Sequence, residues 1–336
     1  MLRKRVSFVA EYKIVISDYY YANQDQEKAV YAKLGDGVEV VDLTKVAPGG
    51  IFEPAQLIPY VRDCDALVVQ FAKITPEVID AMEKCKVISR YAIGVDNINI
   101  EAATKKGIYV ANVPDYCIDE VANTAAAHLL NGLRKVSYAR DLLLDGKFSM
   151  QAIEPLRRLQ NATLCLLGFG NIARNLYGKM KAFFGRIVAY DPFFKSREDY
   201  PDVIFIDDLK RAVAEADAIS IHVPLMDSTR GMVNAEVLAA CKDGVVLVNT
   251  ARGGLIDDEA LMACLDTGKV GMAGLDVIND EDFSHSPYLH HPKVCLTPHF
   301  SWNSAEAGLE LQRKAAENVV STLITGRPVA YVNLRD

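Results

Sequence analysis

Short apolar runs rich in β-branched residues alternate with helical patterns along most of this chain. In the first third, such runs predict four strands, at 13–17, 38–43, 66–71 and 86–91. The stretches 25–34 and 75–84 between them have the spacing of helices. Repeated strand–helix–strand units predict a parallel sheet covered on both faces. Residues 1–10 precede the first run, and their pattern predicts no element.

A second series of the same kind follows a long Ala- and Leu-rich stretch, 118–140. Its apolar residues are spread broadly around a helix, which predicts one buried helix between domains or subunits. Seven further strands are predicted, at 163–168, 186–191, 202–206, 218–224, 245–250, 272–277 and 294–297. The amphipathic stretch 304–325 predicts a last helix that returns to the first unit. We therefore expect an α/β protein with two doubly wound parallel-sheet domains and an active-site cleft between them.

Composition narrows the class of protein. A chain of 336 residues that is 50% hydrophobic can build two packed cores. Its net charge of -7 argues against nucleic-acid or anionic-membrane partners, although a few local arginines can still bind a small anion. The seven cysteines are scattered without CxxC spacing, and their odd number fits no closed disulfide framework. With no sustained apolar stretch at the start, we expect a cytoplasmic protein without signal peptide or membrane span.

The strongest local signal lies directly after the strand predicted at 163–168. Gly168, Gly170 and Ala173 match the pattern G-x-G-x-x-G/A, and Asn171 and Ile172 open the helix that follows. The first glycine permits a tight turn, the second lets the backbone approach a pyrophosphate, and the small third residue keeps the helix close to the strand. The helix N-terminus supplies N–H groups and positive dipole to the anion. The segment therefore predicts a dinucleotide site.

Asp191 ends the next predicted strand, 23 residues after Gly168. A carboxylate there can accept hydrogen bonds from ribose hydroxyls and repel a 2′-phosphate, which favours NAD over NADP. Lys195 and Arg197 lie close enough in sequence to leave this preference open. No pattern predicts a metal site.

Three later segments place polar side chains at strand ends, where open α/β sheets bind ligands. Arg252 follows one strand, Asp276 ends another and is followed by Glu281, and His299 comes after the last strand. Reduction of a 2-oxo acid needs a cation for the carboxylate, a proton donor for the carbonyl oxygen and a hydride from nicotinamide. Arg252 offers a planar fork for the carboxylate, and His299 is suited to proton transfer.

The two carboxylates of these segments, Glu281 and Asp276, have supporting roles in this hypothesis. Glu281 would orient the His299 ring and stabilise its charged form, and Asp276 would bind the nicotinamide carboxamide. Taken singly, the three proposed catalytic residues each have an ordinary alternative role. Arg252 could be a surface ion-pair partner, His299 a loop histidine, and Glu281 part of a solvated acidic run. Their order after a dinucleotide fingerprint favours the catalytic interpretation.

Taken together, these motifs resemble the D-isomer-specific 2-hydroxyacid dehydrogenases. The resemblance covers nearly the whole chain from Lys13 and includes, besides the fingerprint, the segments 90–100, 113–130, 222–234, 249–257, 273–277 and 296–302. It implies a flavodoxin-like substrate domain, 1–112 plus 303–336, and a Rossmann NAD domain, 113–302. It implies a homodimer and the same catalytic roles for Arg252, Glu281 and His299. It also implies carboxylate contacts from Ile93 and Gly94, and cofactor contacts from Thr124, Thr250, Ala251 and Asp276.

The segment from His299 onward is similar to the branch that contains the C-terminal binding proteins. In that branch the residue corresponding to Trp302 lines the substrate pocket, and the one corresponding to Arg90 helps to hold the carboxylate. An indole in the pocket favours an apolar substrate tail over a phosphate, although Trp302 could instead be a packing residue. The chain departs from the family pattern at Ala92, Asn123, Ile278 and Asp282. The last two departures leave open how the loop carrying Glu281 is placed.

The sequence thus predicts an NAD-dependent enzyme that transfers a hydride between nicotinamide and C2 of a small 2-hydroxy or 2-oxo acid, with D specificity implied by the resemblance. One alternative is an NAD(H)-responsive binding protein similar to a corepressor. The other is a dehydrogenase of the phosphite or formate type, for which a pocket containing Trp302 would be large.

Overall fold

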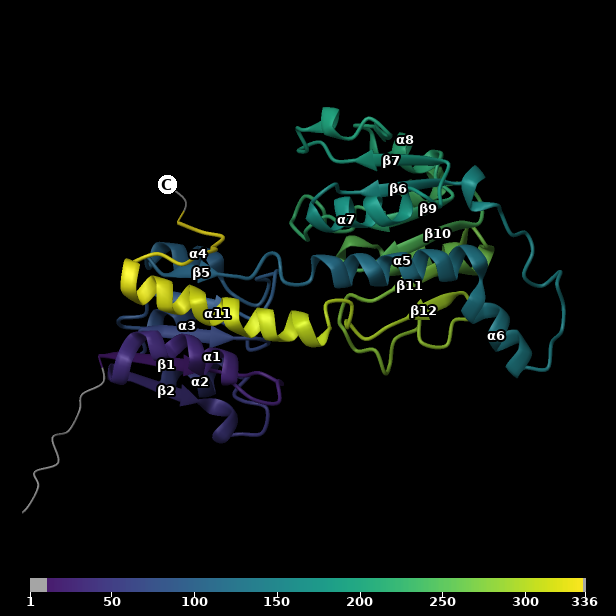
Figure 1. Cartoon of the computed structure of the whole chain (residues 1–336). Helices are drawn as coiled ribbons and strands as arrows, with labels where there is room; N and C mark the ends of the chain where they lie inside the picture. Colours follow the sequence, from purple (N-terminus) through teal and green to yellow (C-terminus); the bar gives the residue numbers. More distant parts are fainter. Residues whose placement is uncertain (1–10, 335–336) are drawn as a thin grey trace, which may run out of the picture. The chain divides into compact units, whose positions relative to one another are not determined.

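The computed structural model describes residues 11–334, and the chain divides into two compact units. Within the described residues, unit 1 combines 11–116 with 304–334, and unit 2 is Cys117–Asn303. Each unit contains its own parallel sheet (Figure 1). The two-domain α/β prediction is therefore confirmed.

Unit 1 is built on a five-stranded sheet. Its strands are β1 (Tyr12–Ile16), β2 (Val38–Asp42), β3 (Ala66–Val69), β4 (Val87–Arg90) and β5 (Tyr109–Ala111). They pair in parallel in the order β2-β1-β3-β4-β5, which is the flavodoxin-like order. The sequence pattern did not predict β5, since three residues are too few to show a period.

The described part of unit 1 has five α-helices: α1 (Asp25–Tyr31), α2 (Pro54–Val61), α3 (Pro76–Ala81), α4 (Ile100–Lys105) and α11 (Ala305–Thr325). The helix predicted at 25–34 ends early, because the chain continues as a 3-10 segment, Ala32–Gly37, with Gly35 at a φ of 74°. α11 packs against α1 and β4, and Ser89 donates a hydrogen bond to the Ala315 carbonyl at 2.9 Å (Figure 1). The predicted return of the last helix to the first unit is confirmed.

Unit 2 is built on a seven-stranded sheet. Its strands are β6 (Thr163–Leu167), β7 (Arg186–Tyr190), β8 (Val203–Phe205), β9 (Ala218–Ile221), β10 (Val245–Asn249), β11 (Val270–Leu275) and β12 (Val294–Leu296). Their parallel order is β12-β11-β10-β9-β6-β7-β8, so the order reverses between β6 and β9 as in dinucleotide-binding sheets. Its helices are α5 (Ile118–Arg134), α6 (Val136–Leu144), α7 (Asn171–Met180), α8 (Leu209–Ala214), α9 (Ala235–Ala240) and α10 (Asp258–Thr267).

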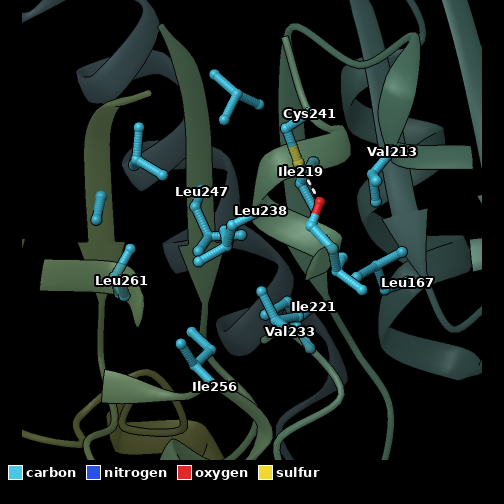
Figure 2. Packing of buried hydrophobic residues seen from close by; sticks show 14 of the residues in the cluster. Leu167, Val213, Ile219, Ile221, Val233, Leu238, Cys241, Leu247, Ile256 and Leu261 are labelled. Atoms are coloured by element: carbon cyan, nitrogen blue, oxygen red, sulfur yellow. Dashed lines mark hydrogen bonds between the residues drawn. The ribbon is translucent and has the colours of Figure 1, made fainter. Parts of the chain in front are cut away.

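Short 3-10 segments interrupt the loops of both units: Ala32–Gly37, Leu43–Lys45, Leu159–Asn161, Arg197–Asp199 and Gly253–Leu255. Unit 2 has two core clusters: one joins its sheet to α8, α9 and α10, and the other joins the sheet to α5 and α7. Fully buried Ile219, Ile221 and Leu247 from the strands meet Val213 and Leu238 from α8 and α9 (Figure 2). Strands that are apolar along their whole length fit a sheet covered on both faces.

The single helix predicted at 118–140 is wrong. The chain forms α5 and α6 instead, because Lys135 between them adopts a left-handed conformation with φ 51° that ends α5. Within the described chain, α5 buries one face, including Val121, Ala125 and Leu129, whereas α6 has no buried residue.

After α6 the chain extends away from the sheet of unit 2 before it returns to β6 (Figure 1). α6 and the segment after it expose several large apolar side chains, among them Leu144 at 70% and Phe148 at 85%. We call residues 136–153 the arm. Between residues 11 and 334, no helix is both long and apolar enough to cross a membrane.

Candidate active site

Three neighbouring strands of unit 2 carry the predicted catalytic segments at one edge of the sheet. Arg252 follows β10, Asp276 directly follows β11, and His299 follows β12. The strands lie side by side in the order β12-β11-β10 and run parallel, so their carboxyl ends share an edge. Segments far apart in sequence thus start from adjacent positions in the fold.

His299 and Glu281 form a direct pair at this edge. His299 Nδ1 lies 2.7 Å from Glu281 Oε1, and the side chains are 37% and 48% exposed. Both residues have positive φ values, 49° for His299 and 54° for Glu281. Such backbone conformations cost about 1–3 kcal/mol each in non-glycine residues and concentrate at functional sites. The bond at Nδ1 orients the ring and leaves Nε2 as the nitrogen for proton transfer.

The loop that carries His299 is held by the buried carboxylate of Asp276. This carboxylate accepts hydrogen bonds from Thr297 Oγ1 at 2.6 Å, Phe300 N at 3.1 Å and Ser301 N at 3.0 Å. The His299 N–H donates to the Asp276 carbonyl at 2.8 Å. Asp276 is 0% exposed, and its hydrogen bonds orient this loop. Contact with the nicotinamide carboxamide stays a prediction.

Behind Thr297 lies His128 of α5, which the sequence analysis did not single out. His128 Nε2 lies 3.2 Å from Thr297 Oγ1, and burial lowers the pKa of His128. The ring is therefore neutral near pH 7. Because the Thr297 hydroxyl donates its one hydrogen bond to Asp276, its oxygen accepts from His128, which requires the His128 tautomer protonated at Nε2.

Arg252 is half-buried on a turn that a buried asparagine shapes. The Asn249 side chain accepts a hydrogen bond from Ala251 N at 3.0 Å and donates to the Arg252 carbonyl at 2.8 Å. Arg252 Nη1 donates to the Ala251 carbonyl at 2.7 Å. Asn249 is 0% exposed, and the sequence analysis missed it because an asparagine at a strand end reads as an ordinary turn residue.

Gly253 brings the Arg252 turn against the segment that leads to Glu281. A Cβ atom at Gly253 would lie 2.0 Å from the carbonyl carbon of Ile278 and 2.4 Å from Asn279 N. Only glycine therefore permits this backbone approach. The departures Ile278 and Asp282 fit the loop: Ile278 is buried in the core, and the Asp282 carboxylate contacts Ser284 and His285.

The dinucleotide fingerprint has the predicted strand–turn–helix form. Gly168 follows β6 with a φ of 91°, and a Cβ there would lie 2.8 Å from the His222 carbonyl oxygen, so glycine is required. Gly170 is the N-cap of α7, followed by the exposed Asn171 and half-buried Ile172. Apart from Gly170 itself and its two chain neighbours, a Cβ at this position would meet no atom of residues 11–334 within 4 Å, which leaves room for a pyrophosphate in front of the helix N-terminus.

Asp191 lies at the end of β7, beside this turn. Its carboxylate accepts hydrogen bonds from Phe169 N at 2.8 Å and from Phe193 N at 2.9 Å, which fixes its position. Arg197, the cation that left the NAD preference open, pairs with Asp207 and donates to the Asp191 carbonyl at 3.1 Å. Its charge is thus partly neutralised.

Two further observations bear on cofactor binding. Thr250 Oγ1 is buried and, within residues 11–334, has no hydrogen-bond partner. Thr250 and Ala251 follow β10 at the same sheet edge as the fingerprint, so this hydroxyl fits a polar group of a bound dinucleotide. Thr124 is half-buried on α5.

The remaining predicted residues are placed as follows. Arg90 Nε donates to the Gln70 carbonyl at 3.2 Å, and its Nη1 lies 3.8 Å from Asp96. Ile93 and Gly94 lie in the loop after β4, and the Ile93 carbonyl accepts from Asn112 at 2.7 Å. Trp302 is half-buried, two positions after Phe300 in unit 2.

His222, after β9, was also missed, although it belongs to a segment quoted for the family resemblance. Its Nε2 lies 2.8 Å from Ser220 Oγ, and burial lowers its pKa to about 4. It is a neutral histidine beside the fingerprint turn.

Comparison with known proteins identifies the family. Residues 126–301 match the family model described as D-isomer specific 2-hydroxyacid dehydrogenase, NAD binding domain. A hydroxypyruvate reductase from Thermotoga maritima is 41% identical over 78% of this chain and 87% of its own length. The chain belongs to the D-isomer-specific 2-hydroxyacid dehydrogenase family.

Other relatives support the assignment. A D-3-phosphoglycerate dehydrogenase from Methanocaldococcus jannaschii is 37% identical over 85% of this chain, which spans only 54% of that relative's length. The structure of a glyoxylate reductase from Paecilomyes thermophila matches with a TM-score of 0.83 and 26% identity over 95% of this chain and 97% of that one. The matched NAD-binding region lies within unit 2 and contains the fingerprint, so the predictions of family and of NAD as cofactor are confirmed.

Proposed function

We propose that this dehydrogenase reduces the C2 carbonyl of a small 2-oxo acid without a phosphate group, with NADH as donor. The observation that carries the proposal is the His299–Glu281 hydrogen bond, at the sheet edge that also bears Arg252. A proton donor, its carboxylate partner and a guanidinium are the groups that this reduction needs.

In the proposed mechanism, the Arg252 guanidinium binds the substrate carboxylate and polarises the adjacent carbonyl. Bound NADH supplies the hydride to C2. His299 Nε2 gives its proton to the carbonyl oxygen, and the Glu281 carboxylate at Nδ1 stabilises the imidazolium before the transfer. In the oxidation direction, His299 takes the hydroxyl proton. Asp276 and Thr297 keep the imidazole in place throughout.

Two observations favour a tail without phosphate. The relative with 41% identity is named a hydroxypyruvate reductase, and a matched structure is that of a glyoxylate reductase. The indole of Trp302, three residues after His299, favours an uncharged tail if it lines the pocket. Hydroxypyruvate and glyoxylate are therefore the first candidates. Membership of the branch that contains the C-terminal binding proteins stays a prediction.

Within this proposal, unit 2 binds NAD, and unit 1 supplies Arg90, Ile93 and Gly94 to the substrate carboxylate. Unit 1 would then act as the substrate domain. Replacement of Arg90 by glutamine should raise KM for the oxo acid by about tenfold and leave the Kd of NADH unchanged. A KM equal to that of the wild type would remove Arg90 from the site.

The experiment that tests the function is NADH oxidation with a panel of 2-oxo acids: glyoxylate, hydroxypyruvate, pyruvate, longer branched acids and 3-phosphohydroxypyruvate. Chiral analysis of the product tests D specificity. We expect turnover with the short acids and little with the phosphorylated one. NADH binding without turnover on any acid, together with NADH-dependent capture of a protein, would favour the corepressor-like alternative. Activity with phosphite or formate alone would favour the alternative of a phosphite- or formate-type dehydrogenase.

We also propose that the protein is a homodimer in the cytoplasm. The exposed apolar side chains of the arm, including Val136, Leu143, Leu144, Phe148 and Met150, form a surface that a second copy would cover. Analytical ultracentrifugation of the wild type and of a Leu144→Asp, Phe148→Asp variant tests this, since the variant should sediment as a monomer. Cell fractionation tests the location.

A further inference from the structure

Two cysteines of unit 1 lie on adjacent chain segments at the amino-terminal edge of its sheet. Cys64 precedes β3 and Cys85 precedes β4, and these neighbouring strands pair in parallel with Ala66 opposite Val87. Cys64 is two residues before Ala66, and Cys85 is two residues before Val87. The register therefore places the two cysteines opposite each other.

Main-chain hydrogen bonds hold the two segments together on both sides of the cysteines. Glu83 N donates to the Arg62 carbonyl, and Lys86 N donates to the Asp65 carbonyl, both at 2.8 Å. Lys84 also pairs with Asp65 at 2.9 Å. Both cysteines are free, and the Cys85 thiol donates a hydrogen bond to the Val87 carbonyl at 3.4 Å. Opposite positions on paired strands lie within the Cα separation that a disulfide spans, about 4.4–6.8 Å.

We propose that Cys64 and Cys85 are a dithiol site that peroxide oxidises reversibly to a disulfide. The site lies at the opposite end of the strands from Arg90, Ile93 and Gly94, and it is independent of the proposed catalytic function.

Burial sets the order of the steps. Cys85 is 8% exposed and Cys64 is 0% exposed, so peroxide meets Cys85 first. The neighbouring Cys85 thiol, together with burial, raises the pKa of the Cys64 thiol, so Cys64 is a poor first nucleophile. The Cys85 sulfur attacks one peroxide oxygen, the O–O bond breaks, and sulfenic acid and water form. Cys64 then attacks the Cys85 sulfur, the S–S bond forms, and the hydroxyl leaves as water with the Cys64 proton. Two thiols are oxidised and one peroxide is reduced to two waters.

The other cysteines provide controls. The buried Cys241 thiol (Figure 2) donates to the Val237 carbonyl at 3.3 Å. Cys264 and Cys295 are only partly buried. Exposure alone would make Cys264 or Cys295 the first to react. If peroxide oxidises Cys64 and Cys85 before Cys264 and Cys295, the cause is the position of Cys64 and Cys85 opposite each other and not exposure.

The test treats the whole folded protein with hydrogen peroxide, quenches it with catalase, and then alkylates the remaining thiols in denaturant for peptide mass spectrometry without reduction. We expect one cross-linked species containing Cys64 and Cys85, two hydrogen masses lighter than the reduced pair and reversed by dithiothreitol. Since the bond closes a loop between residues 21 positions apart, the Tm should rise by about 5 °C. Cys264→Ser should leave both results unchanged, and Cys85→Ser should abolish both.

Two outcomes would overturn the proposal. One is full alkylation of both cysteines after treatment that oxidises Cys264. The other is accumulation of sulfinic acid at Cys85 without a cross-link. Both outcomes are measured on the wild-type protein, so the test stays valid even if a variant folds poorly.

Discussion

The Thr297 hydroxyl donates a 2.6 Å hydrogen bond to the fully buried carboxylate of Asp276. This bond joins the end of β12 to the end of β11, and His299 follows two residues later on the same loop. Because Asp276 also accepts from Phe300 N and Ser301 N, its carboxylate fixes the chain on both sides of His299. The conformation of the proposed proton donor is thus set by residues that need not contact substrate.

Thr297→Val removes this bond while keeping the shape of the side chain. It leaves one carboxylate oxygen with fewer partners and loosens the loop, so we expect kcat to fall about 10-fold, since small displacements of reacting groups are costly. The Kd of NADH, measured by fluorescence titration, should change less than twofold. Thr267→Val, which removes a hydroxyl bonded within its own helix, is the control. Equal kcat values for the two variants would contradict a positioning role for Thr297.

Gly253→Ala should disturb two segments at once. The new Cβ would lie 2.0 Å from the Ile278 carbonyl carbon, so the Arg252 turn and the Glu281 loop must separate. We expect the free energy of unfolding to fall by about 2 kcal/mol and activity to fall more than NADH affinity. Gly178→Ala on α7 should be neutral or slightly stabilising, because beyond its own neighbours and helix backbone no atom of residues 11–334 lies within 4 Å of the new Cβ. Urea unfolding and steady-state kinetics measure both effects, and a neutral Gly253→Ala would refute the close approach.

Asp191→Asn should relax the preference for NADH. The substitution removes the charge that repels a 2′-phosphate, and it keeps one carbonyl oxygen for the Phe193 and Phe194 N–H groups. We expect the ratio of kcat/KM for NADH to that for NADPH to fall at least about 10-fold. Asp199→Asn, an exposed charge change in the same unit, should leave the ratio unaltered. If both variants keep the wild-type ratio, the Asp191 charge does not select the cofactor.

His222 should make the stability of unit 2 depend on pH. Burial lowers its pKa from 6.5 to about 4 in the folded state, so between these values the unfolded state binds more protons. The stabilisation is complete above about pH 6.5 and is lost as the pH falls toward 4, amounting to about 2 kcal/mol between pH 7 and pH 5. Urea unfolding at these two pH values should show a smaller loss for His222→Asn. Equal losses for variant and wild type would show that His222 does not carry this dependence.

The layout of the fold was predictable from the sequence because strands buried on both faces are apolar along their whole length. The break of 118–140 at Lys135 was not, since neither glycine nor proline marks it and only the φ of 51° shows it. The three-residue β5 was too short for a period to be recognised.

The candidate site was predictable where a single residue carries the chemistry. Arg252, Glu281 and His299 could be named because guanidinium, carboxylate and imidazole have distinct roles at strand ends. The supporting residues could not, because Asn249, Thr297 and His128 act through contacts between segments distant in sequence. The cofactor role that the sequence suggested for Asp276 stays a prediction, and its hydrogen bonds show an additional role in holding the His299 loop.

The most direct test of the account is kcat for 2-oxo acid reduction by His299→Gln, measured beside the Kd of NADH and the circular dichroism of the folded protein. The account predicts a fall in kcat of at least about 100-fold, because the proton donor is lost, with NADH affinity and folding unchanged. Glu281→Gln, which keeps the size of the partner and removes its charge, should give a smaller loss. Turnover by His299→Gln within a few-fold of the wild type would contradict the central claim that His299 transfers the proton.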